Sequence, residues 1–472
     1  MLFNTFEFGF FFACVLVGYV ALPHRAQNRM LLLASYLFYA AWDWRFCGLL
    51  AFSTALDYAV ALRLAGTSNP SHRRKWMAVS LVANLGVLGA FKYAGFFAES
   101  FRDLAALLGV SLPGFAFEVV LPIGISFYTF QTLGYTIDVY RRHIEPTRDR
   151  LDYALYVAFF PQLVAGPIER AGHLLPQIRN PRPRDAGGAG RGLWLVLWGL
   201  FKKVVIADNL APVVDAVYAP EASPTSAELI VATYAFTIQL YCDFSGYTDI
   251  ARGTARLLGF EIMRNFNRPY AATSPVDYWR RWHISLSTWL RDYVFFSLGG
   301  NRGTRARVAG RILIAMGLGG LWHGAAWPFV LWGLFHGVWL ILHRLLLPGL
   351  KRIAPASRFG QMTWHAIRVF VTFHGIAFSL LMFRAESVDQ IASLLGTFGG
   401  AFDIGEAGSW LAPLALLLAP LVVMQIAQAR SRDPDAVMHW PWPLRTGIYV
   451  IVFMGILLFG EDGGQPFVYF QF

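Results

Sequence analysis

The stretch Arg311–Leu342, "RILIAMGLGGLWHGAAWPFVLWGLFHGVWLIL", places a histidine between two apolar runs. At its centre, "GGLWHGAAWP" (319–328) sets His323 between two tryptophans and surrounds it with glycines and a proline. Glycine and proline weaken a helix interior, so we expect the helix to be interrupted here. Irregular backbone at bilayer depth is tolerated only where it is buried in protein or lines a cavity. We therefore expect His323 to face a cavity.

The composition of the whole chain is that of a membrane protein. Its 472 residues are 56% hydrophobic and 15% charged, whereas soluble domains carry about 25% charged residues. Apolar tracts of roughly 20 residues, the length that crosses a hydrocarbon core of about 30 Å, recur along the chain. We predict an all-α, polytopic membrane protein with about eleven transmembrane helices and a single domain over residues 1–472.

The expected helices follow these apolar tracts. They cover residues 6–22, 30–43, 46–65, 76–98, 119–139, 192–217, 228–246, 309–321, 327–346, 364–383, 409–428 and 445–460. The pieces 153–166 and 387–402 are too short to span easily, so we expect re-entrant or interfacial segments there.

The distribution of charge predicts partners and orientation. The net charge is +11, but the basic residues fall in short loops between apolar tracts, where orienting charges of membrane proteins lie. Nucleic-acid binding is therefore not expected. Loops rich in arginine and lysine alternate with loops that have few, which places the N-terminus outside the cytoplasm. The cysteines Cys14, Cys47 and Cys242 lie in apolar tracts without disulfide or metal spacing.

The segment "SPVDYWRRWHISLSTWLRDYVFFSLGGNRG" (274–303) interleaves aromatic, apolar and basic residues. Its tryptophans and leucines recur at helical spacing with arginines between them. This pattern is typical of a helix that lies in the plane of the membrane–water interface. Pro275 marks the expected entry of this helix, and Asp277 lies where its N-terminal dipole favours an acid.

Histidines inside these apolar surroundings are candidates for function, because ionisable groups at bilayer depth are costly. Burial keeps an imidazole neutral and able to act as a base near neutral pH. His323 and His283 are the candidates for proton transfer, against the alternative that each only makes a packing hydrogen bond. For His336 and His374 we expect polar contacts between helices.

"YCDFSGYTDIARG" (241–253) places Asp243, Ser245 and Asp249 at the end of an apolar helix. These acids either orient a histidine and line a polar funnel, or lie solvated at a helix-end turn at Ser245-Gly246. No group of histidines, cysteines and acids shows metal-ligand spacing, so we expect no metal.

Several motifs together resemble the membrane-bound O-acyltransferase (MBOAT) family, and within it the bacterial subgroup that acetylates alginate. They are "LPIGISFYTFQTLGYTIDVYR" (121–141), "FFPQLVAGPIER" (159–170), "QLYCDFSGYTDIARG" (239–253), "NFNRPYAATSPVDYWRRWHISLSTWLRDYVFFSLGGNRG" (265–303), "GGLWHGAAW" (319–327) and "QPFVYFQF" (465–472). The resemblance implies about eleven transmembrane helices and re-entrant helices around a central funnel.

The resemblance also implies an activity and its residues. The family's catalytic histidine matches His323, and its second signature position matches His283. The implied donor is acetyl-CoA from the cytoplasm, with no permanently bound cofactor. The residues expected at the donor are Trp279, Arg280, Arg281, Trp282, Arg302 and Trp322. Those expected at the acceptor or a partner are Asp243, Ser245, Phe470 and Phe472.

We therefore expect a multi-pass O-acetyltransferase of the bacterial inner membrane that modifies an extracytoplasmic, alginate-like polysaccharide. The resemblance implies that a periplasmic partner of the SGNH type completes the transfer. The alternative within the same fold is acyl transfer to peptidoglycan, or D-alanyl transfer to teichoic acid. A transporter or channel is a third hypothesis, but it predicts paired interrupted helices in corresponding halves, and a second copy is not found in the sequence.

Overall fold

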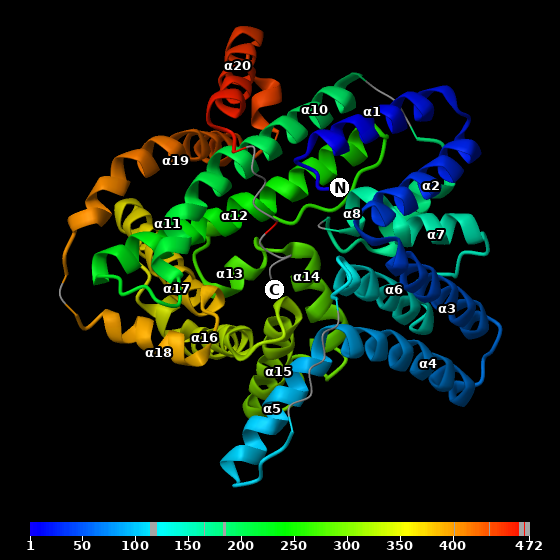
Figure 1. Ribbon diagram of the computed structural model, residues 1–472, viewed down its shortest axis with the longest axis horizontal. Helices are drawn as coiled ribbons and strands as arrows, with labels where there is room; N and C mark the ends of the chain where they lie inside the picture. Colours follow the sequence, from blue (N-terminus) through cyan, green and yellow to red (C-terminus); the bar gives the residue numbers. More distant parts are fainter. Residues whose placement is uncertain are drawn as a thin grey trace. The chain divides into compact units, whose positions relative to one another are not determined.

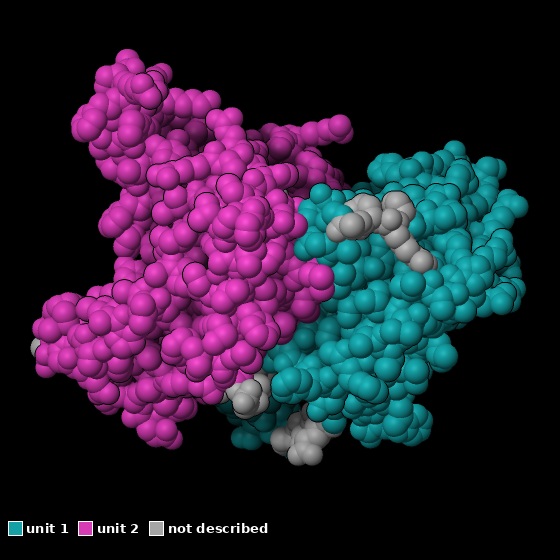
Figure 2. Space-filling view, turned by 90° about the horizontal axis from the view of Figure 1, so that it is seen from above, with its two compact units in different colours: residues 1–192, 251–263 teal, residues 193–250, 264–472 magenta. Residues whose placement is uncertain are grey.

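The computed structural model describes residues 1–113, 120–164, 166–182, 186–400, 402–433, 435–461 and 467. Over these ranges the secondary structure is helical, with no strand (Figure 1), in agreement with the predicted all-α class. The chain divides into two compact units, coloured separately in Figure 2. Unit 1 comprises Met1–Gly192 and Ala251–Met263, and unit 2 comprises Leu193–Ile250 and Arg264–Phe472. The single-domain prediction stays a prediction.

Unit 1 is built from helices that follow one another closely along the chain. They are α1 (Phe6–Ala21), α2 (His24–Asp43), η1 (Trp44–Phe46), α3 (Cys47–Ala65), α4 (Pro70–Leu88), η2 (Gly89–Tyr93), α5 (Ala94–Leu107), α6 (Ile125–Tyr140), α7 (Arg150–Ala158), α8 (Phe160–Leu163), α9 (Ala171–Arg179) and the start of α10 (Ala186–Leu200). Helices α3, α4 and α6 pack on one another, and α7 packs on both α2 and α9. Most of these boundaries fall where glycine, proline or a capping side chain ends the apolar run.

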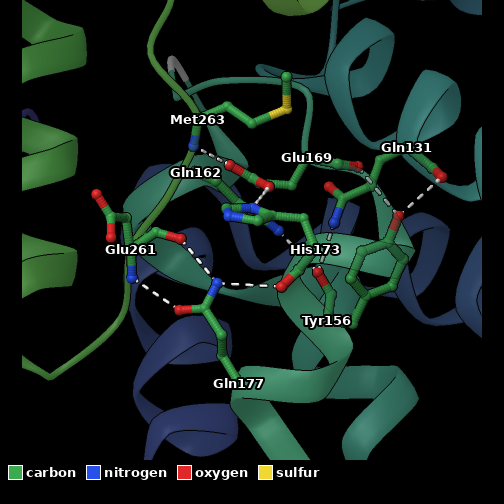
Figure 3. Close-up of polar contacts among 8 residues, drawn as sticks. All are labelled: Gln131, Tyr156, Gln162, Glu169, His173, Gln177, Glu261 and Met263. Carbon is green, nitrogen blue, oxygen red and sulfur yellow. Dashed lines mark hydrogen bonds and ion pairs between the residues drawn. The ribbon is translucent and has the colours of Figure 1, made fainter. Parts of the chain in front are cut away.

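A polar cluster extends from the buried Glu169 to the surface of unit 1 (Figure 3). The buried Glu169 carboxylate accepts hydrogen bonds from the backbone N–H of Met263 and from Nδ1 of His173, the latter at 2.8 Å. Gln177 exchanges two hydrogen bonds of 2.8 Å with the backbone of Glu261. The hydrogen bond to Glu169 raises the pKa of His173 above its usual range. The cluster therefore ties helix α9 to the loop that follows residue 258.

The motif "FFPQLVAGPIER" supplies part of the interior of unit 1. The Nε2 atoms of Gln131 and Gln162 both donate to the backbone carbonyl of Tyr156, at 2.5 and 2.7 Å. The Tyr156 hydroxyl in turn contacts the carbonyls of Gln131 and Glu169, at 3.3 and 3.2 Å (Figure 3). Since a buried backbone carbonyl without a partner is costly, these amides hold the break between α7 and α8 in place.

Unit 2 contains the remaining helices. They are the end of α10, η3 (Phe201–Ala207), α11 (Asp208–Tyr218), most of α12 (Ser226–Leu257), η4 (Pro269–Ala271), α13 (Pro275–Trp279), α14 (Ile284–Trp289), η5 (Leu290–Phe295), α15 (Arg305–His323), α16 (Trp327–Arg352), α17 (Arg358–Arg384), α18 (Val388–Thr397), α19 (Gly405–Ser431), η6 (Ala436–His439) and α20 (Trp442–Phe459). Helices α15 and α16 form the most extensive pair, and α17 packs on α16.

Six helical stretches of the described chain are long and apolar enough to cross a membrane. They are His24–Ala65, Pro70–Leu107, Trp327–Arg352, Arg358–Arg384, Gly405–Ser431 and Trp442–Phe459, and Phe6–Ala21 is a shorter apolar helix. The prediction of a multi-pass membrane protein is confirmed. The predicted number of about eleven crossings stays a prediction.

Candidate active site

The interruption at residues 319–328 is a tight connection between two helices. Helix α15 ends at His323 and α16 begins at Trp327, with a proline in its first turn. The glycines near this connection allow α15 and α16 to pack closely. A Cβ atom on Gly320 would lie 2.1 Å from the carbonyl oxygen of Phe329, and one on Gly333 would lie 2.3 Å from that of Met316. Small residues let helix backbones approach in membranes, so α16 holds the end of α15 in place.

His283 lies between two short helices. The helical spacing of the tryptophans predicts one helix over 274–303, but the structure has α13, α14 and the π-helical turn η5 instead. His283 separates α13 from α14 with a φ of 41°, a left-handed conformation that is uncommon outside glycine. Asn265 stabilises this break, because its carbonyl and Oδ1 accept the N–H groups of Ile284 and Ser285 at 2.9 and 3.2 Å. The side chain of His283 is fully buried, which lowers its pKa to about 3.

The two histidines lie close together among aromatic rings. Their ring centroids are 6.3 Å apart, with the planes at 67°. Trp322 lies 5.6 Å from His283 and 5.1 Å from His323. Trp332 and Phe383 cover His323 at 5.1 and 5.4 Å. Both imidazoles are thus shielded from bulk water by packed rings, and the side chain of His323 is 4% exposed.

His323 also borders a cavity of about 300 Å³. The cavity is lined by Val276, Trp279, Leu286, Ser287, Leu290, Arg291, Phe295, Asn301, Ile312, Ala315, Met316, Gly319, His323, Trp332 and Leu340. Most of these side chains are apolar, with Arg291 and Asn301 among the few polar ones. The expectation that His323 faces a cavity agrees with this arrangement.

The residues predicted to contact the donor are spread over different environments. Trp279 lines the cavity, whereas Trp282 is buried and stacks on Tyr278 with ring centroids 5.6 Å apart. Arg281 makes an ion pair of 2.8 Å with Asp277. The remaining predicted residues are Trp322, which packs against both histidines, and Arg280 and Arg302, which are exposed. Phe470 and Phe472 lie outside the described residues.

Sequence reasoning did not single out Arg291 as a site residue, although it belongs to the same Trp-rich segment. Its side chain lines the cavity and forms an ion pair of 2.7 Å with the neighbouring Asp292. The available signal was a basic residue two positions after Trp289 in this segment.

The acids of α12 have lysine partners that the sequence analysis did not anticipate. Nζ of Lys203 lies 2.8 Å from both Asp208 and Asp243. Nζ of Lys202 lies 2.8 Å from Ser245 Oγ and 2.7 Å from Asp249. Helix α12 runs unbroken through this region, so the alternative of a helix-end turn with solvated acids is wrong. The pair of adjacent lysines in an apolar tract was the signal, since charges at such depth require partners.

The other predicted polar positions have local partners. His336 is buried, and its Nε2 lies 3.1 Å from Ser379 Oγ on α17, the interhelical contact that the sequence predicts. Nδ1 of His374 contacts the carbonyl of Phe370 on its own helix at 2.8 Å. Among the described residues, no group of three or more histidines, cysteines and acids is placed to hold a metal ion.

Comparison with known proteins gives a consistent result. The family model described as the membrane-bound O-acyltransferase family matches residues 116–384. The chain is 37% identical to a probable alginate O-acetylase, AlgI, of Azotobacter vinelandii over 512 aligned positions, which cover 100% of both proteins. It is 41% identical to the probable alginate O-acetylase AlgI of Pseudomonas aeruginosa over 395 positions, 83% of this chain and 73% of the relative. It is 31% identical to the peptidoglycan O-acetyltransferase of Helicobacter pylori over 526 positions, 100% and 98% of the two chains.

The family match contains both histidines and the whole lining of the cavity. The alignment to the Azotobacter relative extends from end to end. The resemblance predicted from the motifs is therefore confirmed, and the chain belongs to the membrane-bound O-acyltransferase family.

Proposed function

We propose that this protein is a membrane O-acetyltransferase that passes an acetyl group from cytoplasmic acetyl-CoA to an extracytoplasmic, alginate-like polysaccharide. The observation that carries the proposal is the position of His323, buried among aromatic rings yet bordering an apolar cavity. The relatives that align over most of the chain are probable alginate O-acetylases, which supports the acceptor class. The relative that acts on peptidoglycan makes that polymer the second candidate.

The proposed reaction needs one group that accepts a proton and later returns it. A neutral imidazole of His323 removes the proton of the acceptor hydroxyl as the oxygen bonds to the thioester carbonyl carbon. The carbon–sulfur bond then breaks, and the imidazolium returns the proton to the departing thiolate. If His323 carries the acetyl group itself, the same balance holds in two steps. No external proton donor is required in either route.

The surroundings of the two histidines favour different roles. His323 is the last residue of α15, and the carbonyls of a last helical turn stabilise positive charge on an imidazole. His283 precedes a helix instead, and burial depresses its pKa to about 3. Environments that differ in this way are typical of acid–base pairs. We therefore assign proton transfer to His323, and orientation of His323 or of the reacting groups to His283.

The cavity supports acyl transfer over hydrolysis. A thioester must be kept from water until the acceptor hydroxyl arrives, and a site with an apolar lining disfavours competing water. Holding the donor and the acceptor together beside His323 supplies a further part of the rate enhancement. We propose that the acetyl end of the donor enters this cavity beside Trp279.

The polar part of the donor requires a cationic surface. We propose Arg280 and Arg302, which are exposed, as contacts for the phosphates of acetyl-CoA, because charge-assisted hydrogen bonds to phosphate are strong. Arg281 is a weaker candidate, since Asp277 already neutralises it. Acetyl-CoA acts here as a substrate, and the proposal includes no permanently bound cofactor.

The remaining parts of the proposal concern place and partner. We propose that the chain lies in the bacterial inner membrane with its N-terminus in the periplasm, as the alternation of basic loops favours. A periplasmic partner of the SGNH type receives the acetyl group before the polysaccharide does. Asp243, Ser245, Phe470 and Phe472 are proposed contacts for the acceptor or the partner. For Asp243 and Ser245, the lysine contacts support a positioning role as well.

The test is acetyl transfer from radiolabelled acetyl-CoA to alginate by membranes that contain the protein and its genetic neighbours. His323→Ala is expected to lower the rate at least about 100-fold, the usual contribution of a general base. His283→Asn, which tolerates the left-handed backbone, is expected to reduce the rate while the protein still folds. His374→Ala is the matched control, because this half-buried histidine donates its hydrogen bond within its own helix and packs on Tyr234 of α12, away from the two candidate histidines. Full transfer by His323→Ala would reject the assignment.

A further inference from the structure

The cavity beside His323 is larger than an acetyl group requires. Its volume is about 300 Å³, whereas an apolar cavity of about 150 Å³ in a protein interior already binds a benzene molecule. An acetyl group has two carbon atoms, and benzene has six. Space for several further carbon atoms therefore lies beside the imidazole of His323.

The cavity follows helices α15 and α16 away from His323. The residues that α15 contributes recur at helical spacing and therefore share one face; they are Ile312, Ala315, Met316, Gly319 and His323. Ile312 and His323 are eleven residues apart, which is about 16 Å along the helix axis. On α16 the lining begins at Trp332, which packs on His323, and it ends at Leu340. Both helices thus give the cavity one end at His323 and a length that leads away from it.

The lining along this length is mostly hydrocarbon, from leucine, isoleucine, methionine and phenylalanine side chains. Two of its polar residues already have partners, because Ser287 Oγ donates to the Trp282 carbonyl and Asn301 Oδ1 accepts from Arg344. The pantetheine arm of coenzyme A carries amide groups, which are costly to bury without hydrogen bonds. A hydrocarbon chain needs no such partners, so it is the ligand that this lining favours.

We propose that this cavity is an acyl-chain site, and that the protein transfers acyl groups longer than acetyl, such as butyryl and hexanoyl, from their CoA thioesters. The inference rests on the proposed function, because it extends the donor of that reaction. The chemistry is unchanged: the acceptor oxygen bonds to the acyl carbonyl carbon, the carbon–sulfur bond breaks, and the hydroxyl proton ends on the CoA thiol. The carbonyl group lies at His323, and the alkyl chain extends along α15 toward Ile312.

Small residues on α15 keep the cavity open near His323. Gly319 is about one turn from His323, and an added Cβ atom there would lie 3.0 Å from Cδ1 of Leu290. Ala315 is buried about two turns from His323, and Ile312 lies about three turns away. A larger side chain at position 315 is therefore expected to shorten the accepted acyl chain more than one at position 312.

The first test measures binding without catalysis. Thioethers of coenzyme A that carry an ethyl, butyl or hexyl group have no acyl group to transfer, and titration calorimetry gives their Kd for the full-length protein in lipid nanodiscs. Each buried CH₂ group strengthens binding by up to about fourfold, so the Kd is expected to fall from the ethyl to the hexyl compound. Empty nanodiscs correct for chains that enter the lipid. A Kd that stays constant or rises with chain length would overturn the proposal.

The second test compares acyl groups in transfer, through the ratio of kcat/KM for hexanoyl-CoA to kcat/KM for acetyl-CoA. Ala315→Phe fills the cavity and is expected to lower this ratio at least about tenfold. Ile312→Phe is expected to lower it less, and it decides the outcome if Ala315→Phe fails to fold. The control is Ile314→Phe, which adds the same ring on the exposed side of α15 and is expected to leave the ratio unchanged.

The outcomes separate this proposal from the proposed function. Transfer of acetyl without transfer of butyryl or hexanoyl would overturn the acyl-chain site and leave acetyl transfer standing. Equal ratios in the wild type, Ala315→Phe and Ile312→Phe would also overturn it, because the chain would then lie elsewhere. Failure to transfer any acyl group would reject the proposed function instead, and the binding of the thioethers would still decide whether the cavity holds an alkyl chain.

Discussion

Replacing Gly320 by alanine tests whether the close contact between α15 and α16 positions the catalytic histidine. The added Cβ atom would lie 2.1 Å from the carbonyl oxygen of Phe329, where an ordinary contact is at least 3.4 Å. The added Cβ atom would therefore be 1.3 Å too close to that oxygen. The atom it meets is backbone, which cannot rotate away as a side chain does, so the two helices must separate. His323 lies one turn further along α15.

The expected effect on catalysis follows from that displacement. A misplacement of about 1 Å at a reacting group lowers a rate about 100-fold. Overpacking of a tight contact destabilises a protein by about 1–3 kcal/mol, which leaves most molecules folded in a protein of ordinary stability. We therefore expect Gly320→Ala to lose about two orders of magnitude in acetyl transfer while it still inserts and melts cooperatively.

The control is Gly310→Ala in the same helix, where an added Cβ atom meets nothing within 4 Å. That substitution is expected to keep full activity and to stabilise the helix by about 0.5–1 kcal/mol, because alanine restricts the unfolded chain more than glycine does. The assay compares the initial rates of transfer from labelled acetyl-CoA, normalised to folded protein in the membrane. Equal rates for Gly320→Ala and Gly310→Ala would refute the idea that this contact sets the position of His323.

Three further predictions concern stability. The raised pKa of His173 contributes stability that is fully present below the unfolded pKa of about 6.5 and is lost as pH rises through the folded pKa. The difference in melting temperature between wild type and His173→Ala should therefore shrink across that window. Lys203→Met leaves buried carboxylates unbalanced and should destabilise by about 3–5 kcal/mol. Arg45→Met breaks an exposed ion pair and should leave the free energy of unfolding nearly unchanged; both are measured by denaturation in detergent. Ser379→Ala removes the partner of His336 Nε2 and should cost about 1–3 kcal/mol, and an unchanged melting temperature would contradict this.

Local patterns were sufficient to predict the interruption at His323. Glycine and proline are common at helix boundaries, and the structure ends α15 and begins α16 within two residues of the break predicted from Gly324 and Pro328. The proximity of His283 to His323 has a different source. Forty residues separate them, and no periodicity brings them together, so only the family resemblance predicted a shared site.

Two elements were mispredicted because tertiary contacts override local preference. Serine and glycine at 245–246 predicted the end of a helix, but α12 continues through them. The helix continues because Gly246 packs against the backbone of Gly199. The helical spacing of tryptophans over 274–303 predicted one helix, yet His283 breaks it. That break needs Asn265, twenty residues away, to satisfy the first N–H groups of α14. Neither contact is visible in a window of local sequence.

In unit 2, close contacts of glycine with backbone lie beside both the charged cluster around Lys203 and the candidate catalytic cluster around His323, and one physical reason applies to both. Cβ atoms on Gly199 and Gly246 would lie 2.7 and 2.8 Å from the opposite backbone, and Lys203 beside them reaches Asp243 at 2.8 Å. Gly320 repeats the arrangement beside His323. Polar groups at membrane depth are tolerable only with partners at contact distance, and larger residues would hold the helices too far apart. A glycine facing a backbone carbonyl thus sets the helix spacing at which a buried ion pair or a buried imidazole becomes stable.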